Sequence, residues 1–572
     1  MSPNDSPLDN GRSSRPHDAE TVGEAWLRLL KRRGVDCLYA NAGTDFPSIV
    51  EGLARSEQLG LDAPRAVICP HENAAVSMAH GHAAVTGRPQ AVMVHVTVGT
   101  ANALSGLINA ERDNIPLLMC AGRTPVHEDG PSGARSLNIH WAQEMFDQAS
   151  MVRETVRWDY ELRAPAQLEI ATDRALAIAQ SAPRGPVYLT LPREVLADVP
   201  ATPTFADQPL LDPAGTIGPD PAAIDRAVRL LDEATRPLIV TARAGIDPSV
   251  PARLARLAER LGAPVVEYRP RHLNLAGDHP LHGGFEVGPW LAQADCVLVI
   301  DCDVPWIPKL NPRAPGQVVI QAGEDPLQRH YPIRGFPSDV TLAGSAGLVI
   351  DALHDAVADA PARRKAAMAD AEQTRTQARQ AADANPSRLT AATVSAAIDR
   401  VRAPDALLVN EYPLVRSVMT LTEGAGFLGS SPAGGLGWGL PAALGAKLAR
   451  PEREVIACLG DGSYLFANPL ACHQIAAAEG LGILIVIFDN ARWGAVDRAT
   501  RALYPDGFAA RANRMPLTSL EPSPDYAAVA RACGLDGATV TDAADLDGAL
   551  DRALNTVRGA GRSFVLSVRL AA

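Results

Sequence analysis

Short, continuous apolar runs alternate with helical segments along the first third of the chain. A helix is predicted in "AETVGEAWLRLLKRRG", where apolar residues recur every three to four positions and Gly34 supplies the stop. Strands are predicted in "VDCLYANAG", "RAVICP", "QAVMVHVTVG", "IPLLMCAG" and "PVYLTLP". These runs are apolar throughout, which indicates strands that are covered on both faces. The pattern therefore predicts a parallel sheet with helices on either side.

The same alternation returns twice more along the chain. The second set of strands is predicted in "RPLIVTA", "APVVEY", "CVLVIDCD" and "QVVIQAG", and the third in "DALLVNE", "EVIACLG", "ILIVIFDN" and "SFVLSVRL". We therefore expect an α/β protein of three domains, each a mostly parallel sheet flanked by helices. The predicted boundaries are a disordered lead at 1–18, domains at 19–195, 221–355 and 387–572, a Pro-rich linker at 196–220 and a charged helical connector at 356–386.

The composition of the chain restricts the classes of function. The net charge is -12, and no apolar run approaches the roughly 18 residues that a membrane-spanning helix needs. Neither a nucleic-acid partner nor a membrane role is therefore expected. The first residues lack the apolar core of a signal peptide, which favours a cytoplasmic protein. The eight cysteines contain no Cys-x-x-Cys pair, which argues against zinc and disulfides. A small-molecule partner is the remaining expectation.

A carboxylate between two glycines follows one predicted strand. Gly460, Asp461 and Gly462 come directly after the strand at 455–459, and Asn490 ends the next strand, after a helix predicted at 469–479. The two strand ends of such a βαβ unit meet at one edge of the sheet, where open parallel sheets bind ligands. A turn alone would explain an isolated Gly-Asp-Gly. A carboxylate and an amide oxygen at the same edge instead suit Mg²⁺ bridging to a diphosphate.

This arrangement resembles the diphosphate and metal motif of thiamine-diphosphate-dependent enzymes of the acetolactate synthase and benzoylformate decarboxylase superfamily. The resemblance implies thiamine diphosphate and Mg²⁺ as cofactors. It also implies that Asp461, Asn490 and the main-chain oxygen of Arg492 are the metal ligands. The segment between Asp461 and Asn490 is slightly longer than in the best-known members. Further cofactor contacts in the same region would be made by Gly460, Gly462, Ser463 and Trp493.

Two further motifs carry the same resemblance. In "PHENAAVSMAHGHAAVTG", Glu72 matches the glutamate that hydrogen-bonds the aminopyrimidine of the cofactor, although alone it would be an ordinary acid in a first helical turn. In "SSPAGGLGWGLPAALGAKLA", Leu436 matches the apolar residue that keeps the cofactor bent, and Gly435 a main-chain contact. The three domains would then be pyrimidine-binding, middle and diphosphate-binding. The cofactor would lie between subunits of a homodimer or homotetramer.

The segment "QAVMVHVTVGTANA" resembles benzoylformate decarboxylases within this family. His95 matches their active-site acid or base, although a single strand histidine is more often a core residue. Thr44 falls where those enzymes have a substrate-contacting serine. A second histidine is expected from the middle domain, with His279 preferred over His282, and both could instead lie on a surface loop. The resemblance implies a decarboxylase or carboligase acting on a 2-oxo acid or an aldehyde.

Other members of the family remain alternatives. An acetolactate synthase is disfavoured because Arg123 replaces an expected glutamine and because the middle domain lacks the Gly- and Met-rich loop that holds flavin, so FAD is not expected. A 2-hydroxyacyl-CoA lyase stays open, since Arg243 could meet a nucleotide phosphate or lie exposed on a loop. A non-catalytic cofactor-binding subunit is disfavoured by Glu72, which it would not need. The Arg-rich segment 491–516 is either a lid over an acidic substrate or a solvated loop.

Overall fold

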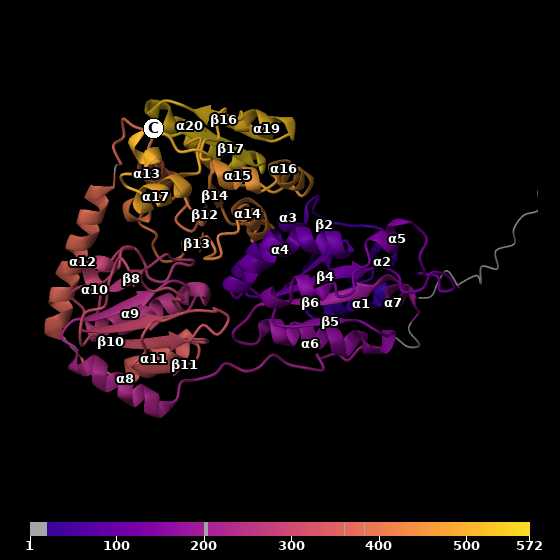
Figure 1. Ribbon diagram of the computed structural model, residues 1–572, viewed down its shortest axis with the longest axis horizontal. Helices are drawn as coiled ribbons and strands as arrows, with labels where there is room; N and C mark the ends of the chain where they lie inside the picture. The colour runs from indigo at the N-terminus through magenta and orange to yellow at the C-terminus, as the bar shows by residue number, and fades with distance from the viewer. Residues whose placement is uncertain (1–19, 200–203, 360, 383, 572) are drawn as a thin grey trace, which may run out of the picture.

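The computed structural model contains three parallel sheets, which follow one another along the chain (Figure 1). It describes residues 20–199, 204–359, 361–382 and 384–571. The sheets contain six, five and six strands, and all paired strands in these residues run parallel. The predicted α/β fold of three domains is thereby confirmed. The expected disordered lead, 1–18, lies outside the described residues.

The first domain has the strand order β2-β1-β3-β4-β6-β5. One face of this sheet is buried against α1, α2 and α6 and the other against α3 and α4, which explains why its central strands are predominantly apolar. Its elements are α1 (Val22–Arg32), β1 (Cys37–Ala40), α2 (Pro47–Leu59), β2 (Arg65–Ile68), α3 (Glu72–Thr86), β3 (Gln90–Val94), α4 (Val96–Arg112), β4 (Leu117–Arg123), α5 (Ile139–Ala142), β5 (Asp159–Glu161), α6 (Leu168–Gln180), β6 (Pro186–Pro192) and α7 (Arg193–Ala197).

The middle domain has a five-stranded sheet of order β11-β10-β9-β7-β8. The charged connector that follows it is helical, as predicted, and packs on α9. The elements are α8 (Pro221–Glu233), β7 (Pro237–Thr241), α9 (Val250–Leu261), β8 (Val265–Glu267), α10 (Gly288–Leu291), β9 (Cys296–Ile300), β10 (Val318–Gly323), β11 (Val340–Ala343), α11 (Ala346–Ala356) and the connector α12 (Pro361–Ala381).

The third domain repeats the strand order of the first, as β13-β12-β14-β15-β17-β16. Such an order puts a crevice at the carboxyl ends of β1 and β3 in one sheet and of β12 and β14 in the other. The elements are α13 (Ala391–Val401), β12 (Leu407–Glu411), β13 (Gly426–Gly429), α14 (Gly439–Ala449), β14 (Val455–Gly460), α15 (Asp461–Phe466), α16 (Pro469–Ala478), β15 (Leu484–Asp489), α17 (Gly494–Leu503), α18 (Phe508–Arg511), α19 (Tyr526–Ala532), β16 (Asp536–Val540), α20 (Leu546–Ala560) and β17 (Phe564–Arg569).

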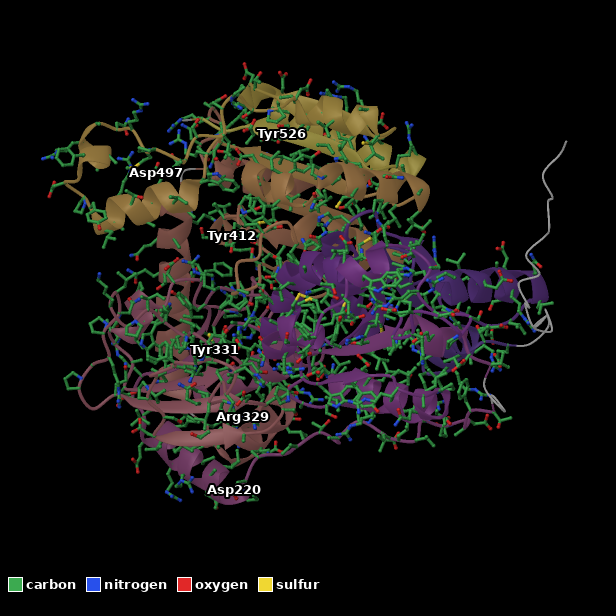
Figure 2. All side chains as sticks on the ribbon, turned by 45° about the vertical axis from the view of Figure 1, so that its right-hand side comes forward. Asp220, Arg329, Tyr331, Tyr412, Asp497 and Tyr526 are labelled. Atoms are coloured by element: carbon green, nitrogen blue, oxygen red, sulfur yellow. The ribbon has the colours of Figure 1, made fainter. Side chains whose placement is uncertain are left out.

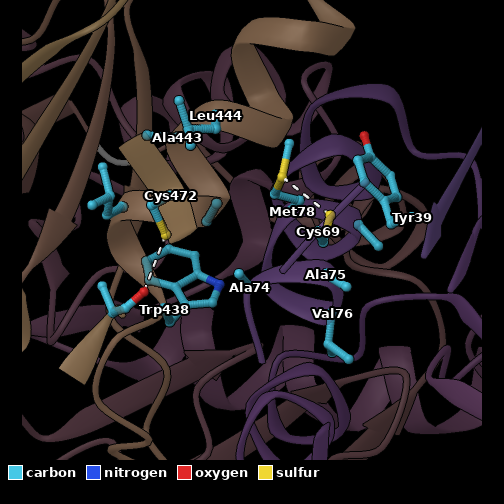
Figure 3. Close-up of a cluster of buried hydrophobic side chains, with 14 of the residues drawn as sticks. Tyr39, Cys69, Ala74, Ala75, Val76, Met78, Trp438, Ala443, Leu444 and Cys472 are labelled. Carbon is cyan, nitrogen blue, oxygen red and sulfur yellow. Dashed lines mark hydrogen bonds between the residues drawn. The ribbon is translucent and has the colours of Figure 1, made fainter. Parts of the chain in front are cut away.

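The first and third domains meet through α3 and α14, whose backbones touch. A Cβ atom at Gly81 would collide with the main-chain oxygen of Ala442, and one at Gly445 would collide with that of Met78. Apolar side chains of both domains consequently form a single buried cluster, part of which is drawn in Figure 3. The two domains therefore share a core instead of lying loosely side by side.

Some elements differ from the predicted ones. The strand predicted through "QAVMVHVTVG" ends at Val94, and α4 begins at Val96. Four strands were not predicted, namely β5, β11, β13 and β16, and each lies at the edge of its sheet. Among the described residues, no helix has the length and apolar character needed to cross a bilayer.

The contact between α3 and α14 predicts a large effect of a small substitution. Gly445→Ala should lower the free energy of unfolding by about 2 kcal/mol or more, because the methyl group meets backbone that cannot rotate away. Gly559→Ala is the matched control, since Gly559 also lies in a helix but has nothing within 4 Å of the added methyl group. The control should be neutral or slightly stabilising. Urea-induced unfolding of both variants measures the difference, and equal stabilities would contradict the close helix contact.

Candidate active site

His95 and Asp45 form a short hydrogen-bonded pair at the carboxyl ends of β3 and β1. His95 Nδ1 lies 2.5 Å from Asp45 Oδ1, and the Asp45 side chain is only 3% exposed. A Cβ atom at Gly43 would collide with the imidazole and one at Gly122 with the carboxylate, so both glycines make room for the pair. The hydrogen bond to Asp45 raises the pKa of His95, although burial opposes this. A histidine in this setting is able to exchange a proton.

The turn that carries His95 is strained. Val96 has φ 33°, in the left-handed region that a β-branched residue rarely occupies. Asp45 Oδ2 accepts the Val96 N–H at 3.2 Å, so one carboxylate holds both the backbone turn and the imidazole. Backbone strain of this kind is common at functional sites. Sequence reasoning missed Asp45, although its position next to Thr44 offered a signal.

The segment after β4 folds back over this pair. Gln143 Nε2 lies 3.1 Å from His95 Nε2, and His140 Nε2, on α5, lies 3.4 Å from Thr44 Oγ1. The structure thus brings Thr44 and His95, both predicted from the sequence, to one edge of the first sheet. His140 and Gln143 were not predicted, because a loop that folds back leaves no periodic signal.

Glu72 is the first residue of α3 and is 7% exposed. Its Oε2 atom accepts a hydrogen bond from Asn102 Nδ2 at 3.1 Å. The negative charge of Glu72 also raises the pKa of His95, after the larger effect of the Asp45 hydrogen bond. Glu72, His95, Asp45 and Thr44 together form the first-domain half of the site.

Asp461 begins α15 directly after β14 and is 3% exposed. Its Oδ1 atom accepts the Gly462 N–H at 2.9 Å, whereas Oδ2 is buried and has no hydrogen-bond partner among the described residues. Burial raises the pKa of Asp461 to about 6. A buried carboxylate oxygen without a donor is suited to a hard cation, so this position fits Mg²⁺.

The other predicted metal ligands follow β15, the strand next to β14. Asn490 is exposed, and its Oδ1 atom accepts the Arg492 N–H at 3.1 Å. The main-chain oxygen of Arg492 accepts the Gly494 N–H at 2.9 Å. Side-chain and main-chain oxygens therefore line the same edge as Asp461, which is the oxygen-rich environment that Mg²⁺ prefers.

The glycines around Asp461 let other groups approach the backbone. A Cβ atom at Gly462 would collide with the indole of Trp493, which packs edge-on against Phe466 at 5.7 Å between ring centroids. A Cβ atom at Gly460 would have only Ser463 Oγ within 4 Å, at 3.9 Å. The turn is thus covered by an aromatic ring on one side and open to a ligand at Gly460.

The loop of residues 434–438, which contains Leu436, is held by a buried carboxylate. Glu411, at the end of β12, accepts the Gly437 N–H at 2.8 Å and the Gly439 N–H at 2.6 Å. Burial raises the pKa of Glu411 to about 7. Sequence reasoning missed Glu411, although it ends a predicted strand at the ligand-binding edge. Its two hydrogen bonds hold the main chain of the loop in place.

Asn109 ties the same loop to the first domain of the same chain. Its Nδ2 atom donates to the Gly435 oxygen at 2.8 Å, and its Oδ1 atom accepts the Gly435 N–H at 3.1 Å. His95 caps the opposite end of α4, and the rise of about 1.5 Å per residue separates it from Asn109 by roughly 20 Å. Within one chain, His95 and the Leu436 loop therefore lie too far apart to act on one reacting atom.

The middle-domain candidates are more buried than expected. His282 is 1% exposed, and its Nε2 atom lies 3.0 Å from Glu267 Oε2, so it is a core residue and not part of a surface loop. His279 is partly buried, with Nε2 3.6 Å from Glu259 Oε1. Arg243 is 4% exposed and lies 3.9 Å from Asp301, so it is not an exposed loop residue. Among the described contacts of one chain, none joins these side chains to His95.

Comparison with known proteins places the chain in a family. Models of the thiamine pyrophosphate enzymes match residues 20–151 (N-terminal TPP binding domain), 224–353 (central domain) and 413–566 (C-terminal TPP binding domain). The chain is 26% identical to the sulfoacetaldehyde acetyltransferase of Rhodobacter capsulatus, over 93% of this chain and 92% of that protein. It is 27% identical to the benzoylformate decarboxylase of Pseudomonas aeruginosa, over 94% and 97%.

A solved structure shows the same fold. The thiamine diphosphate-dependent 4-hydroxybenzoylformate decarboxylase of Rhodococcus jostii RHA1 superposes with a TM-score of 0.76 at 23% identity, covering 96% of this chain and 99% of that one. At this identity the likeness concerns the fold alone. The three domain models match in order and together cover most of the sequence, so the chain belongs to the thiamine pyrophosphate enzymes.

Proposed function

We propose that the protein is a thiamine-diphosphate-dependent 2-oxo acid decarboxylase or carboligase of the benzoylformate decarboxylase type. The observation that carries the proposal is the His95–Asp45 pair beside Thr44 and Glu72. Release of an aldehyde requires delivery of a proton to carbon, whereas ligation to a second carbonyl compound does not. A dedicated acid with a raised pKa therefore favours decarboxylation followed by protonation.

The candidate site residues of the first and third domains fit the cofactors of the family. Thiamine diphosphate, when bound, supplies a carbon nucleophile and takes up the electron pair released beside a carbonyl group. Asp461, Asn490 and the main-chain oxygen of Arg492 would hold Mg²⁺ and, through it, the diphosphate. Glu72 would hydrogen-bond the aminopyrimidine. The buried, unpartnered Oδ2 atom of Asp461 supports this assignment.

His95 would transfer its proton at Nε2. Its Nδ1 atom is committed to Asp45, which leaves Nε2 as the atom that faces the remainder of the sheet edge, next to Gln143. The Gln143 amide can present its oxygen to a protonated Nε2 or its N–H to an unprotonated one, so it tolerates both states. The Thr44 hydroxyl would contact the substrate. These roles need no group beyond those at the edge of the first sheet.

We further propose that two chains build each active site, as a homodimer or within a homotetramer. The separation of His95 from the Leu436 loop along α4 supports this arrangement. The helix α17, marked by Asp497 in Figure 2, follows the metal-binding edge and has no buried residue. Its Val496 and Leu503 side chains are 49% and 65% exposed, which suits contact with another chain. The segment 491–516 is thus helical in part and would contribute to the rim of a shared site.

Replacement of Glu72 tests the enzyme class. Glu72→Gln should lower turnover at least 100-fold, because the neutral amide cannot share a proton with the aminopyrimidine. CO2 release from pyruvate, branched 2-oxo acids and benzoylformate, with thiamine diphosphate and Mg²⁺ supplied, measures the effect. Glu57→Gln, on the exposed surface of α2, is the control and should be unaffected. Retained turnover in Glu72→Gln would contradict the proposed chemistry.

The pH dependence of turnover tests the His95–Asp45 pair. The hydrogen bond to Asp45 raises the pKa of His95, so the protonated acid should persist to higher pH than in an ordinary histidine and kcat should fall as pH rises through the raised pKa. Asp45→Asn removes the charge and weakens the hydrogen bond, so the falling limb should move to lower pH by about one unit or more. Profiles of kcat against pH for both proteins check this shift. A limb that stays in place would show that His95 does not supply the proton.

Mixing of two inactive variants tests the shared site. His95→Ala disables the first-domain half and Asp461→Ala the third-domain half. If each site combines halves of two chains, half of the sites in mixed dimers are intact, so random exchange should restore about a quarter of wild-type activity. Exchange is carried out by dilution and reassociation, with each variant treated alone as the control. No recovery, despite proven mixed dimers, would place each site within one chain.

A further inference from the structure

Arg193 differs from the other arginines at the edge of the first sheet. Arg123 and Arg135 both pair with Glu144, at 2.8 and 3.1 Å. Arg193, directly after β6, has no carboxylate oxygen within 4.0 Å among the residues that the structure describes. Its NH1 atom instead lies 3.3 Å from Ser136 Oγ and 3.5 Å from His140 Nε2. One guanidinium at this edge therefore keeps its charge uncompensated by a carboxylate.

The tautomer of His140 is fixed by its surroundings. His140 is 2% exposed, and its Nδ1 atom accepts the Ser136 N–H at 3.1 Å. A ring nitrogen that accepts from a backbone N–H carries no proton, so neutral His140 carries its proton on Nε2. Burial, and secondly the charge of Arg193, lower the pKa of His140 and favour the neutral form. The Nε2–H group therefore points its proton toward Arg193 and Thr44.

Three groups that can donate hydrogen bonds lie close together here, and no single acceptor among the described residues binds all three. The Nε2–H of His140 and the NH1 group of Arg193 lie 3.5 Å apart, and neither can accept from the other. The Thr44 hydroxyl lies 3.4 Å from the same His140 nitrogen. An anionic oxygen placed between these groups would accept from all three, and hydrogen bonds to a charged acceptor are stronger than neutral ones. Thr44 precedes Asp45, so this point adjoins the His95–Asp45 pair.

We propose that Thr44, His140 and Arg193 form a subsite for a second acidic group of the substrate, one that stays on the molecule throughout the reaction. The inference rests on the proposed function and names its substrate class: a short 2-oxo acid or aldehyde with a carboxylate or sulfonate at its far end. Both groups offer the planar or tetrahedral set of anionic oxygens that a guanidinium binds.

The carboxylate that leaves as CO2 is a poor occupant of this subsite. Decarboxylation converts a localised negative charge into neutral CO2, so a cation bound to that carboxylate stabilises the reactant more than the transition state. Such binding would slow the reaction. A retained acidic group is bound equally in both states, so Arg193 can orient the substrate without this disadvantage.

Matched substrates test the subsite. Holoenzyme with thiamine diphosphate and Mg²⁺ is assayed for CO2 release from 2-oxoglutarate, its 5-methyl ester and the corresponding sulfonate. Wild-type kcat/KM should be about 10- to 100-fold higher for the acids than for the ester, and Arg193→Met should reduce this ratio to near one. Arg226→Met, on the exposed face of α8, is the control and should keep the ratio. The carboxylate and sulfonate arms show which acid the subsite prefers.

A binding measurement separates this inference from the proposed function. Calorimetric titration of holoenzyme with glutarate, an unreactive dianion, should show affinity weakened at least tenfold in Arg193→Met. If the wild type releases no CO2 from any substrate but Arg193→Met weakens glutarate binding, the subsite stands and the proposed reaction falls. A wild-type ratio near one, a ratio unchanged by Arg193→Met, or equal glutarate affinities would overturn the subsite.

Discussion

The direct backbone contact between α3 and α14 is the constraint on which the rest of the structure depends. Gly81 and Gly445 admit no side chain there, so the helices approach until their main chains touch. The first and third domains consequently bury one common apolar cluster. Glu72 begins α3 and the Leu436 loop leads into α14, so this contact also determines where both halves of the site face. Because protein interiors are densely packed, a fixed contact between two helices leaves the residues at their ends little freedom to move.

The first and third domains use equivalent positions of the same topology for different chemistry. In each sheet a buried carboxylate stands at the end of the strand that borders the switch point: Asp45 after β1 and Glu411 at the end of β12. Asp45 holds the His95 turn, and Glu411 holds the loop before α14. The neighbouring strand is then followed by the candidate site residue, His95 after β3 and Asp461 after β14. One scaffold thus places a histidine paired with a buried carboxylate at the sheet edge of one domain and a buried aspartate at the equivalent edge of the other.

The central strands of every sheet were predicted from the sequence, whereas the four strands that were missed all lie at sheet edges. Central strands such as β3 and β14 are covered on both faces and are therefore apolar throughout. The edge strands β5 and β16 are only partly buried, so their sequences lack such a run. Glu72, His95 and Asp461 were proposed as site residues because they follow strand ends or open a helix and match family motifs. The partners of His95 were not, because Asp45 and Gln143 reach it only through strand order and loop folding, which no local pattern encodes.

Several local preferences are violated in the two halves of the candidate site. Val96 adopts a left-handed turn, Asp45 and Glu411 are buried carboxylates, and His140 and Arg193 face each other donor to donor. Backbone strain such as that at Val96 costs on the order of 1–3 kcal/mol. Such costs persist only where the surroundings prevent relaxation. Here the surroundings include the apolar core, so the same packing that stabilises the fold keeps these side chains from relaxing to other positions.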